Sequence, residues 1–244
     1  MSHTVIARES SEVLGLWERG YGYSPANRGC LLAGWAHPGA SWSRLASMSI
    51  GQRNRAVLEL WSETFGSRVD CHVDCPACGS SLELELNVFD MLGSSGAVTP
   101  GGGVAESSGY RVEYRPLCTA DLVAVQDCGS VEEARQALLA RCVVEASVPA
   151  AELPEEVVAA VGEALANSDP PADIVLRTAC AECGYSWSPG CDLIALVWHS
   201  VETAAGRMLD DIHVLAERYG WREADILALS PARRQAYVER VWLE

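Results

Sequence analysis

The sequence predicts an α+β fold in which a cysteine-bearing β unit is split by a large insert and followed by a C-terminal helical unit. Two identical motifs, Cys-x-x-Cys-Gly, occur at 75–79 and 180–184. A segment in which polar and apolar residues alternate follows the first motif, as in a half-exposed strand, and short segments on both sides of the second are also expected to be strands. Apolar residues at three- and four-residue intervals over 192–219 predict one long helix.

The two motifs have the composition of a metal site. Two residues between the cysteines let both sulfurs turn toward one ion, and the glycine permits the positive φ that the turn requires. Two such pairs form the tetrahedral four-thiolate site that Zn²⁺ prefers. We therefore expect one structural Zn²⁺ per chain, bound by Cys75, Cys78, Cys180 and Cys183. The fold would be a zinc ribbon with a large insert between its halves, since 101 residues separate Cys78 from Cys180.

Other chemistry at these cysteines is less consistent with the sequence. A catalytic zinc usually keeps three protein ligands and an open position, whereas both pairs here are complete. Disulfide exchange normally uses a motif that opens a helix, whereas a glycine and a strand follow here. We expect no enzymatic activity. The sequence leaves open whether Cys71, His72 or Cys191 joins or replaces a ligand.

Residues 1–70 are predicted to form an N-terminal helical region. A helix is expected over 9–19, followed by an irregular, aromatic segment at 21–39. Ser49 precedes a second helix with an apolar face. Gln52 lies three residues later, which completes a capping-box pattern.

The first half of the ribbon is assigned to residues 71–92. Residues 82–86 read Leu-Glu-Leu-Glu-Leu, and this strict alternation predicts a strand. Residues 93–109 are almost all small or polar, so we expect a flexible linker there.

The insert resumes as an α/β segment at 110–173. An alternating strand is expected over 110–115. Thr119 and Ser130 are predicted to cap two helices. Pro154 is expected as the first residue of a third helix, because proline suits that position.

The second half of the ribbon is assigned to residues 174–191, with strands expected at 174–177 and 185–187. The C-terminal helical unit covers 192–244. Its long helix should stop at Gly220, which suits a left-handed cap, and two shorter helices should follow.

Composition limits the possible partners and compartment. The net charge is −15, which repels phosphate backbones and argues against nucleic-acid binding. No apolar run approaches a membrane span, and no secretory signal pattern begins the chain. Ten cysteines without such a signal suggest a reducing cytoplasm. The alternative is a zinc-ribbon transcriptional regulator, since 216–239 could form a helix-turn-helix bearing two adjacent arginines.

The C-terminal segment also resembles a known family. The carrying motifs are HVLAERYGW at 213–221 and EADILALSPARRQAY at 223–237, supported more weakly by CPACG, CAECGYSW and IGQRNRAVLEL. They resemble the T-even-type phage baseplate family, described as baseplate proteins or baseplate hub assembly chaperones of contractile injection systems. Arg222 departs from that pattern, which has a capping serine or threonine there.

This resemblance implies a non-enzymatic role in tail assembly. Expected partners are hub, spike, wedge or tube-initiator proteins, met in the cytoplasm during assembly. The protein would then either leave the particle or stay in it. The expected partner-binding surface lies around Trp221, Ile226, Arg233 and Tyr237.

Overall fold

The computed structural model describes residues 10–94 and 101–241, which combine α-helices and β-strands. The helices are α1 (Ser10–Gly20), α2 (Pro25–Ala36), α3 (Trp42–Ser47), α4 (Ile50–Thr64), α5 (Val88–Ser94), α6 (Thr119–Val125), α7 (Val131–Cys142), α8 (Glu155–Ser168), α9 (Leu193–Tyr219), α10 (Glu223–Leu227) and α11 (Pro231–Val241). The strands are β1 (Arg68–Asp74), β2 (Ser81–Asn87), β3 (Gly103–Ser107), β4 (Tyr110–Tyr114), β5 (Val143–Ala146), β6 (Thr178–Ala179) and β7 (Ser186–Trp187). Two 3-10 turns are η1 (Ala150–Glu152) and η2 (Pro170–Ala172).

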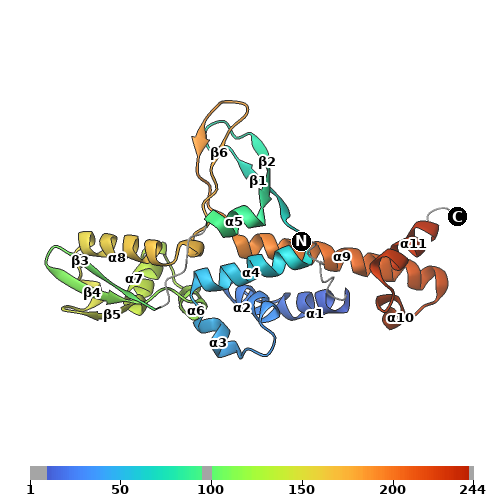
Figure 1. The fold of residues 1–244 in the computed structure, drawn as a ribbon, viewed down its shortest axis with the longest axis horizontal. Coiled ribbons are helices and arrows are strands. Elements are labelled where there is room, and N and C mark those ends of the chain that lie inside the picture. Colours follow the sequence, from blue (N-terminus) through green and yellow to red (C-terminus); the bar gives the residue numbers. More distant parts are fainter. Residues whose placement is uncertain (1–9, 95–100, 242–244) are drawn as a thin grey trace.

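A helical body lies at the centre of an elongated molecule, and three smaller parts extend from it (Figure 1). A sheet with two helices lies at one end, the cysteine-bearing hairpins project from one side, and α9 carries α10 and α11 at the other end. None of the described helices is long and apolar enough to cross a membrane.

Helices α1, α2, α4 and the first half of α9 form the core of this body. Its buried side chains include Leu16, Leu32, Leu58, Trp61, Val197 and Trp198. Helix α4 begins as predicted, because Ser49 and Gln52 make the reciprocal hydrogen bonds of a capping box. Helix α9 begins after Asp192, which caps it, and ends at Gly220 in the left-handed conformation, also as predicted.

The expectation of irregular structure at 21–39 is wrong. Most of that segment is α2, whose first turn is capped by Ser24 and carries Pro25 at its start. Two glycines weaken the helix pattern in the sequence. The helix forms because it is buried on two sides: Leu32 packs in the main core of the body, and Cys30 packs against Leu45 of α3.

The expectation of a flexible linker at 93–109 is also wrong where the structure describes it. Helix α5 continues to Ser94 and β3 begins at Gly103, while 95–100 lie outside the described residues. Strand β3 forms an antiparallel hairpin with the predicted strand β4, and β5 adds to the other edge of β4. Positions 102 and 103 require glycine, because a Cβ at either position would collide with Tyr114.

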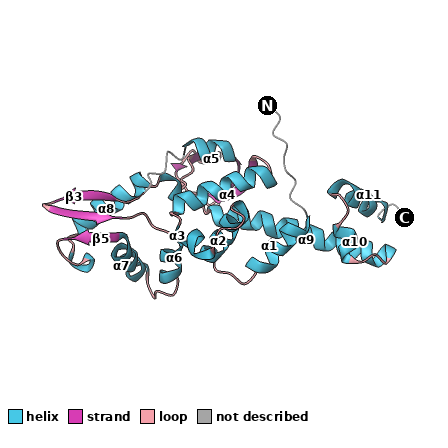
Figure 2. Cartoon of the chain, turned by 60° about the horizontal axis from the view of Figure 1, so that its bottom comes forward, coloured by secondary structure: helices cyan, strands magenta, loops and turns pink. Residues whose placement is uncertain are grey.

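Helices α7 and α8 both pack against this three-stranded sheet (Figure 2), on a cluster that includes Val112, Leu139 and Val157. Ser130 caps α7, as predicted. Helix α6 differs, because its N-cap is Cys118 and the predicted cap, Thr119, is the first helical residue.

The sheet end is attached to the body through the N-terminus of α4. The Gly51 N–H donates to Asp169 Oδ2 at 2.8 Å, and Asn54 Nδ2 donates to the Pro171 carbonyl at 2.9 Å. The Ile50 N–H donates to the Leu117 carbonyl at 2.9 Å. The start of α4 is therefore hydrogen-bonded to two separate segments of the insert, one at Leu117 and one at 169–171.

Candidate metal centre

The first cysteine motif forms the turn between β1 and β2. The hairpin register closes with Asp74 opposite Ser81, so residues 75–80 make the connection. The Cys75 N–H donates to the Ser80 carbonyl at 2.9 Å, and the Gly79 N–H donates to the Cys75 carbonyl at 2.8 Å. Gly79 has φ +75°, the left-handed conformation for which glycine was expected.

The second motif repeats this turn between β6 and β7. The Cys180 N–H donates to the Tyr185 carbonyl at 2.8 Å, and the Gly184 N–H donates to the Cys180 carbonyl at 2.9 Å. Gly184 has φ +71°. The two motifs therefore share one backbone geometry, in which each pair of cysteines lies in a tight turn.

The structure brings all four predicted ligands together. Their sulfurs lie within 4.8 Å of one another, with 3.7 Å between Cys75 and Cys183 and 3.6 Å between Cys78 and Cys180. These separations are too long for disulfide bonds. The first cysteine of each motif is buried and the second is exposed. The cluster could hold one metal ion.

The pKa values of the two exposed thiols, Cys78 and Cys183, are shifted in opposite directions. Hydrogen bonds from the hydroxyl and the backbone N–H of Ser80 lower the pKa of Cys78 to about 6. At Cys183 the backbone N–H of Tyr185 acts to lower the pKa, but desolvation and the three neighbouring sulfurs outweigh it and raise the pKa to about 12. Four thiolates so close together repel one another unless a cation lies between them.

The three neighbours that the sequence left open lie outside the cluster, which contains only the four motif cysteines among the described residues. Cys71 is buried on β1. His72 is exposed, with its Nε2 3.5 Å from Glu83 Oε1 across the hairpin. Cys191 packs at the edge of the body's core, where burial raises the pKa of its thiol to about 11.

The predicted strand at 174–177 is reduced to a single bridge, and regular pairing begins only at Thr178. Backbone hydrogen bonds nevertheless continue the hairpin downward, from the Leu176 N–H to the Pro189 carbonyl and from the Cys191 N–H to the Ile174 carbonyl. The second motif is thereby connected by paired backbone to the start of α9.

Ser80, whose hydroxyl and backbone N–H lower the pKa of Cys78, was not identified from the sequence.

The predicted partner-binding residues gather at the far end of α9. Trp221 stacks on Tyr219, with ring centroids 4.8 Å apart, and meets Tyr237 edge-on at 4.9 Å. Arg233 is exposed, with its guanidinium 5.9 Å from the Tyr237 ring centre. Ile226 was expected on the surface, and this is wrong.

Ile226 is fully buried, in a small core with Leu215 and Val238. Helix α10 is short, and Ile226 is the buried side chain by which it packs on α9. Ile226 therefore packs beneath Trp221 and Tyr237 and is not itself accessible to a partner.

Comparison of the chain with protein-family models, with curated proteins and with solved structures finds no match. Inferences about function therefore depend on the geometry and on the sequence motifs.

Proposed function

We propose that Cys75, Cys78, Cys180 and Cys183 bind one structural Zn²⁺ and that the two hairpins together form a zinc ribbon. A tetrahedral site with Zn–S bonds of about 2.3 Å has sulfur–sulfur edges of about 3.8 Å. The distances of 3.6 and 3.7 Å between sulfurs carry this proposal. Four thiolates fill the coordination sphere and leave no position for a reacting water, so the role of the ion is structural.

The ion would fix two hairpins that do not pair with each other. Strands β1 and β2 form one sheet, and β6 and β7 form another. At their bases, Val69 and Ile174 belong to the core of the body. A shared ion at the tips would therefore hold each hairpin in place relative to the other and to α9. Elemental analysis of the purified protein tests this, with one zinc per chain expected.

At the level of biological role, we infer a non-enzymatic baseplate (hub) assembly factor, or a baseplate component, of a contractile phage-tail-like injection system. The support comes from where the family-like residues lie. Residues 213–221 end α9, and 223–237 form α10 and α11, which pack back on α9. The two motifs that carry the resemblance thus lie in one structural unit at an end of the molecule (Figure 1).

The surface proposed for partner binding is the aromatic patch, defined as Tyr219, Trp221, Arg233 and Tyr237. Tyr219 is 38% exposed, and Trp221 and Tyr237 are half-buried. Aromatic and arginine side chains are the types that most often dominate protein–protein binding energy. Hub, spike, wedge or tube-initiator proteins are the proposed partners, met in the cytoplasm.

The test is recovery of baseplate proteins on the tagged protein from the native host. Arg233→Glu should reduce recovery, whereas Arg207→Glu, the same charge change at an exposed position of α9, should not. Recovery of no baseplate component, together with salt-sensitive retention of DNA, would favour the transcriptional regulator instead.

The structure lends that regulator little support. Of its two adjacent arginines, Arg234 is buried and its Nε donates to Asp211 Oδ2 at 2.9 Å. The projecting hairpin carries acidic side chains, including Asp70, Glu83 and Glu85. Such a surface repels phosphates.

A further inference from the structure

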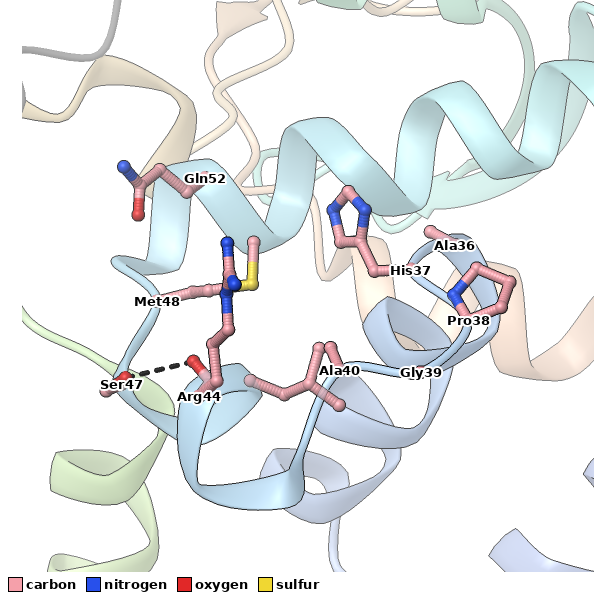
Figure 3. Close-up of a pocket in the computed structure, with 10 residues that line it drawn as sticks. Ala36, His37, Pro38, Gly39, Ala40, Arg44, Ser47, Met48 and Gln52 are labelled. Atoms are coloured by element: carbon pink, nitrogen blue, oxygen red, sulfur yellow. Dashed lines mark hydrogen bonds between the residues drawn. The ribbon is translucent and has the colours of Figure 1, made fainter.

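A hollow of about 840 Å³ opens between the loop after α2, helix α3 and the first turn of α4. Binding sites for small ligands commonly enclose about 300–1,000 Å³. Figure 3 shows Arg44, Met48 and Gln52 toward one side of this hollow, and His37 and Pro38 toward the other. The hollow shares no residue with the metal centre or the aromatic patch.

The polar groups around the hollow are mainly hydrogen-bond donors without partners. Among the described residues, the guanidinium of Arg44 and the imidazole of His37 make no hydrogen bond or ion pair. Gln52 Oε1 accepts from the Ser49 N–H, which leaves the amide N–H groups of Gln52 available. A ligand that offered acceptors would therefore find donors from three directions.

The charge around the hollow is opposite to that of the whole protein. The chain has 33 acidic and 18 basic residues, yet residues 20–58 contain four arginines and no aspartate or glutamate. None of the residues that line the hollow is acidic. In an otherwise acidic protein, this acid-free segment favours an anion at Arg44.

The remaining lining narrows the class of anion. Leu45, Met48 and Pro38 contribute apolar surface beside the single permanent cation. A nucleic-acid backbone would require a series of cations, one for each phosphate it neutralises. One carboxylate attached to an apolar body fits this mixture of groups better, because guanidinium and carboxylate form bidentate hydrogen bonds.

We propose that this hollow binds a carboxylate-bearing ligand with an apolar body, and that Arg44 is the residue that recognises the carboxylate. Gln52 and His37 donate further hydrogen bonds, and Met48 contacts the apolar part. An acidic segment of a protein partner or a free organic acid could supply the same chemistry.

The proposal is tested by the fluorescence anisotropy of a labelled peptide in which leucine and glutamate alternate. Wild-type protein should bind it saturably, more weakly at high salt, and should not bind the peptide with glutamine in place of glutamate. Arg44→Gln should weaken binding about tenfold, since one charge-assisted pair is lost. Arg207→Gln, the same change at an exposed position of α9, should leave binding unchanged.

Competition with 3-phenylpropionate shows whether the natural ligand is a free organic acid or a segment of a protein. Displacement of the peptide at similar concentration indicates a free organic acid, and displacement only by unlabelled peptide indicates a protein segment. Because Arg44 and His37 are exposed, their variants should fold normally, and His37→Glu provides a second test by adding a repelling charge.

The proposal is overturned if Arg44→Gln and Arg207→Gln bind the peptide equally, or if wild type binds neither acid. Arg44-dependent binding of a single-stranded oligonucleotide without binding of the peptide would also overturn it, because the ligand would then be a phosphate chain. Each of these failures would leave the proposed metal site and aromatic patch unaffected.

Discussion

The sulfur atoms of Cys78 and Cys180 lie 3.6 Å apart, although 102 positions separate these residues in the chain. Each cysteine belongs to a turn closed by its own backbone hydrogen bonds, and the two sheets share no strand pairing. The contact between the turns is therefore made by sulfur atoms that repel one another when ionised. A divalent cation between them would convert this repulsion into the strongest link between the hairpins.

Replacing Cys183 by Ser should remove the metal. Three thiolates bind Zn²⁺ far less tightly than four, so zinc should fall from one per chain to near zero by elemental analysis. The free energy of unfolding should fall by about 3 kcal/mol or more, because tight binding to the folded state is a stabilising term. Cys128→Ser, which changes a partly buried thiol outside the cluster, is the matched control.

A chelator distinguishes loss of metal from damage to the fold. It should lower the Tm of the wild type toward that of the Cys183→Ser variant and leave the Tm of the variant unchanged. A variant that keeps a full zinc content and the stability of the wild type would disprove this ligand set.

The features that could be predicted from the sequence are those determined by neighbouring residues. The capping box of Ser49 and Gln52 involves residues three apart, and the stop of α9 needs only Gly220. The four-cysteine cluster brings distant residues together, yet it could also be predicted from short local patterns. The repeated motif makes both halves recognisable without knowledge of the 101 residues between them.

The features that could not be predicted depend on distant partners. Strand β3 follows directly on a run of glycines and becomes a strand because β4 pairs with it and Ala105 is buried under α8. Ile226 has no periodic pattern in so short a helix, and only the packing of α10 on α9 makes it a core residue. The donors of the hollow were missed because two of them, His37 and Arg44, are isolated in the sequence.

Gly51→Ala should destabilise the protein even though alanine is the better helix former. A Cβ at this position would overlap Oδ1 of Asp169 and break the hydrogen bond from the Gly51 N–H to Oδ2. We expect a loss of about 2 kcal/mol in denaturant unfolding, since overpacking costs about 1–3 kcal/mol.

Gly162→Ala is the control for that experiment, because Gly162 lies within α8 with nothing within 4 Å of a new Cβ. It should stabilise the protein by up to about 1 kcal/mol through helix propensity alone. Equal effects of the two substitutions would show that the contact between α4 and Asp169 contributes nothing.

Asp121→Asn should destabilise the insert by about 2 kcal/mol at neutral pH, in urea unfolding followed by circular dichroism. The Asp121 side chain is fully buried, with its Oδ2 2.7 Å from Arg115 Nη1 and its Oδ1 2.7 Å from Arg141 Nε. Desolvation alone would raise the pKa of this carboxyl. Hydrogen bonds from Arg115, the Cys118 N–H and thiol, and Arg141 outweigh it and hold the pKa well below its ordinary range.

The pH dependence follows from that direction. A carboxyl whose pKa is lower in the folded protein contributes fully above its unfolded pKa, about 3.9, and its contribution is lost as pH falls below that value. The stability difference between wild type and Asp121→Asn should therefore be constant from about pH 5 to 7 and shrink toward pH 2. Taking the difference would cancel any acid release of the proposed zinc, because both proteins have the same four cysteines. A stability difference that stayed constant from pH 7 down to pH 2 would contradict the lowered pKa of Asp121.

The same substitution should strongly destabilise the protein at Arg234 and have almost no effect on stability at the adjacent Arg233. Arg234 is 5% exposed and bonded to Asp211, so Arg234→Gln leaves a carboxylate without its cation beneath α11 and should cost about 2 kcal/mol. Arg233→Gln changes an exposed side chain and should alter stability by less than about 0.5 kcal/mol. Hydrogen exchange of the α11 amides measures both, with faster exchange expected only for Arg234→Gln. If Arg233→Gln were the destabilising change, the exposed patch would be part of the folding core and could not serve as a free docking surface.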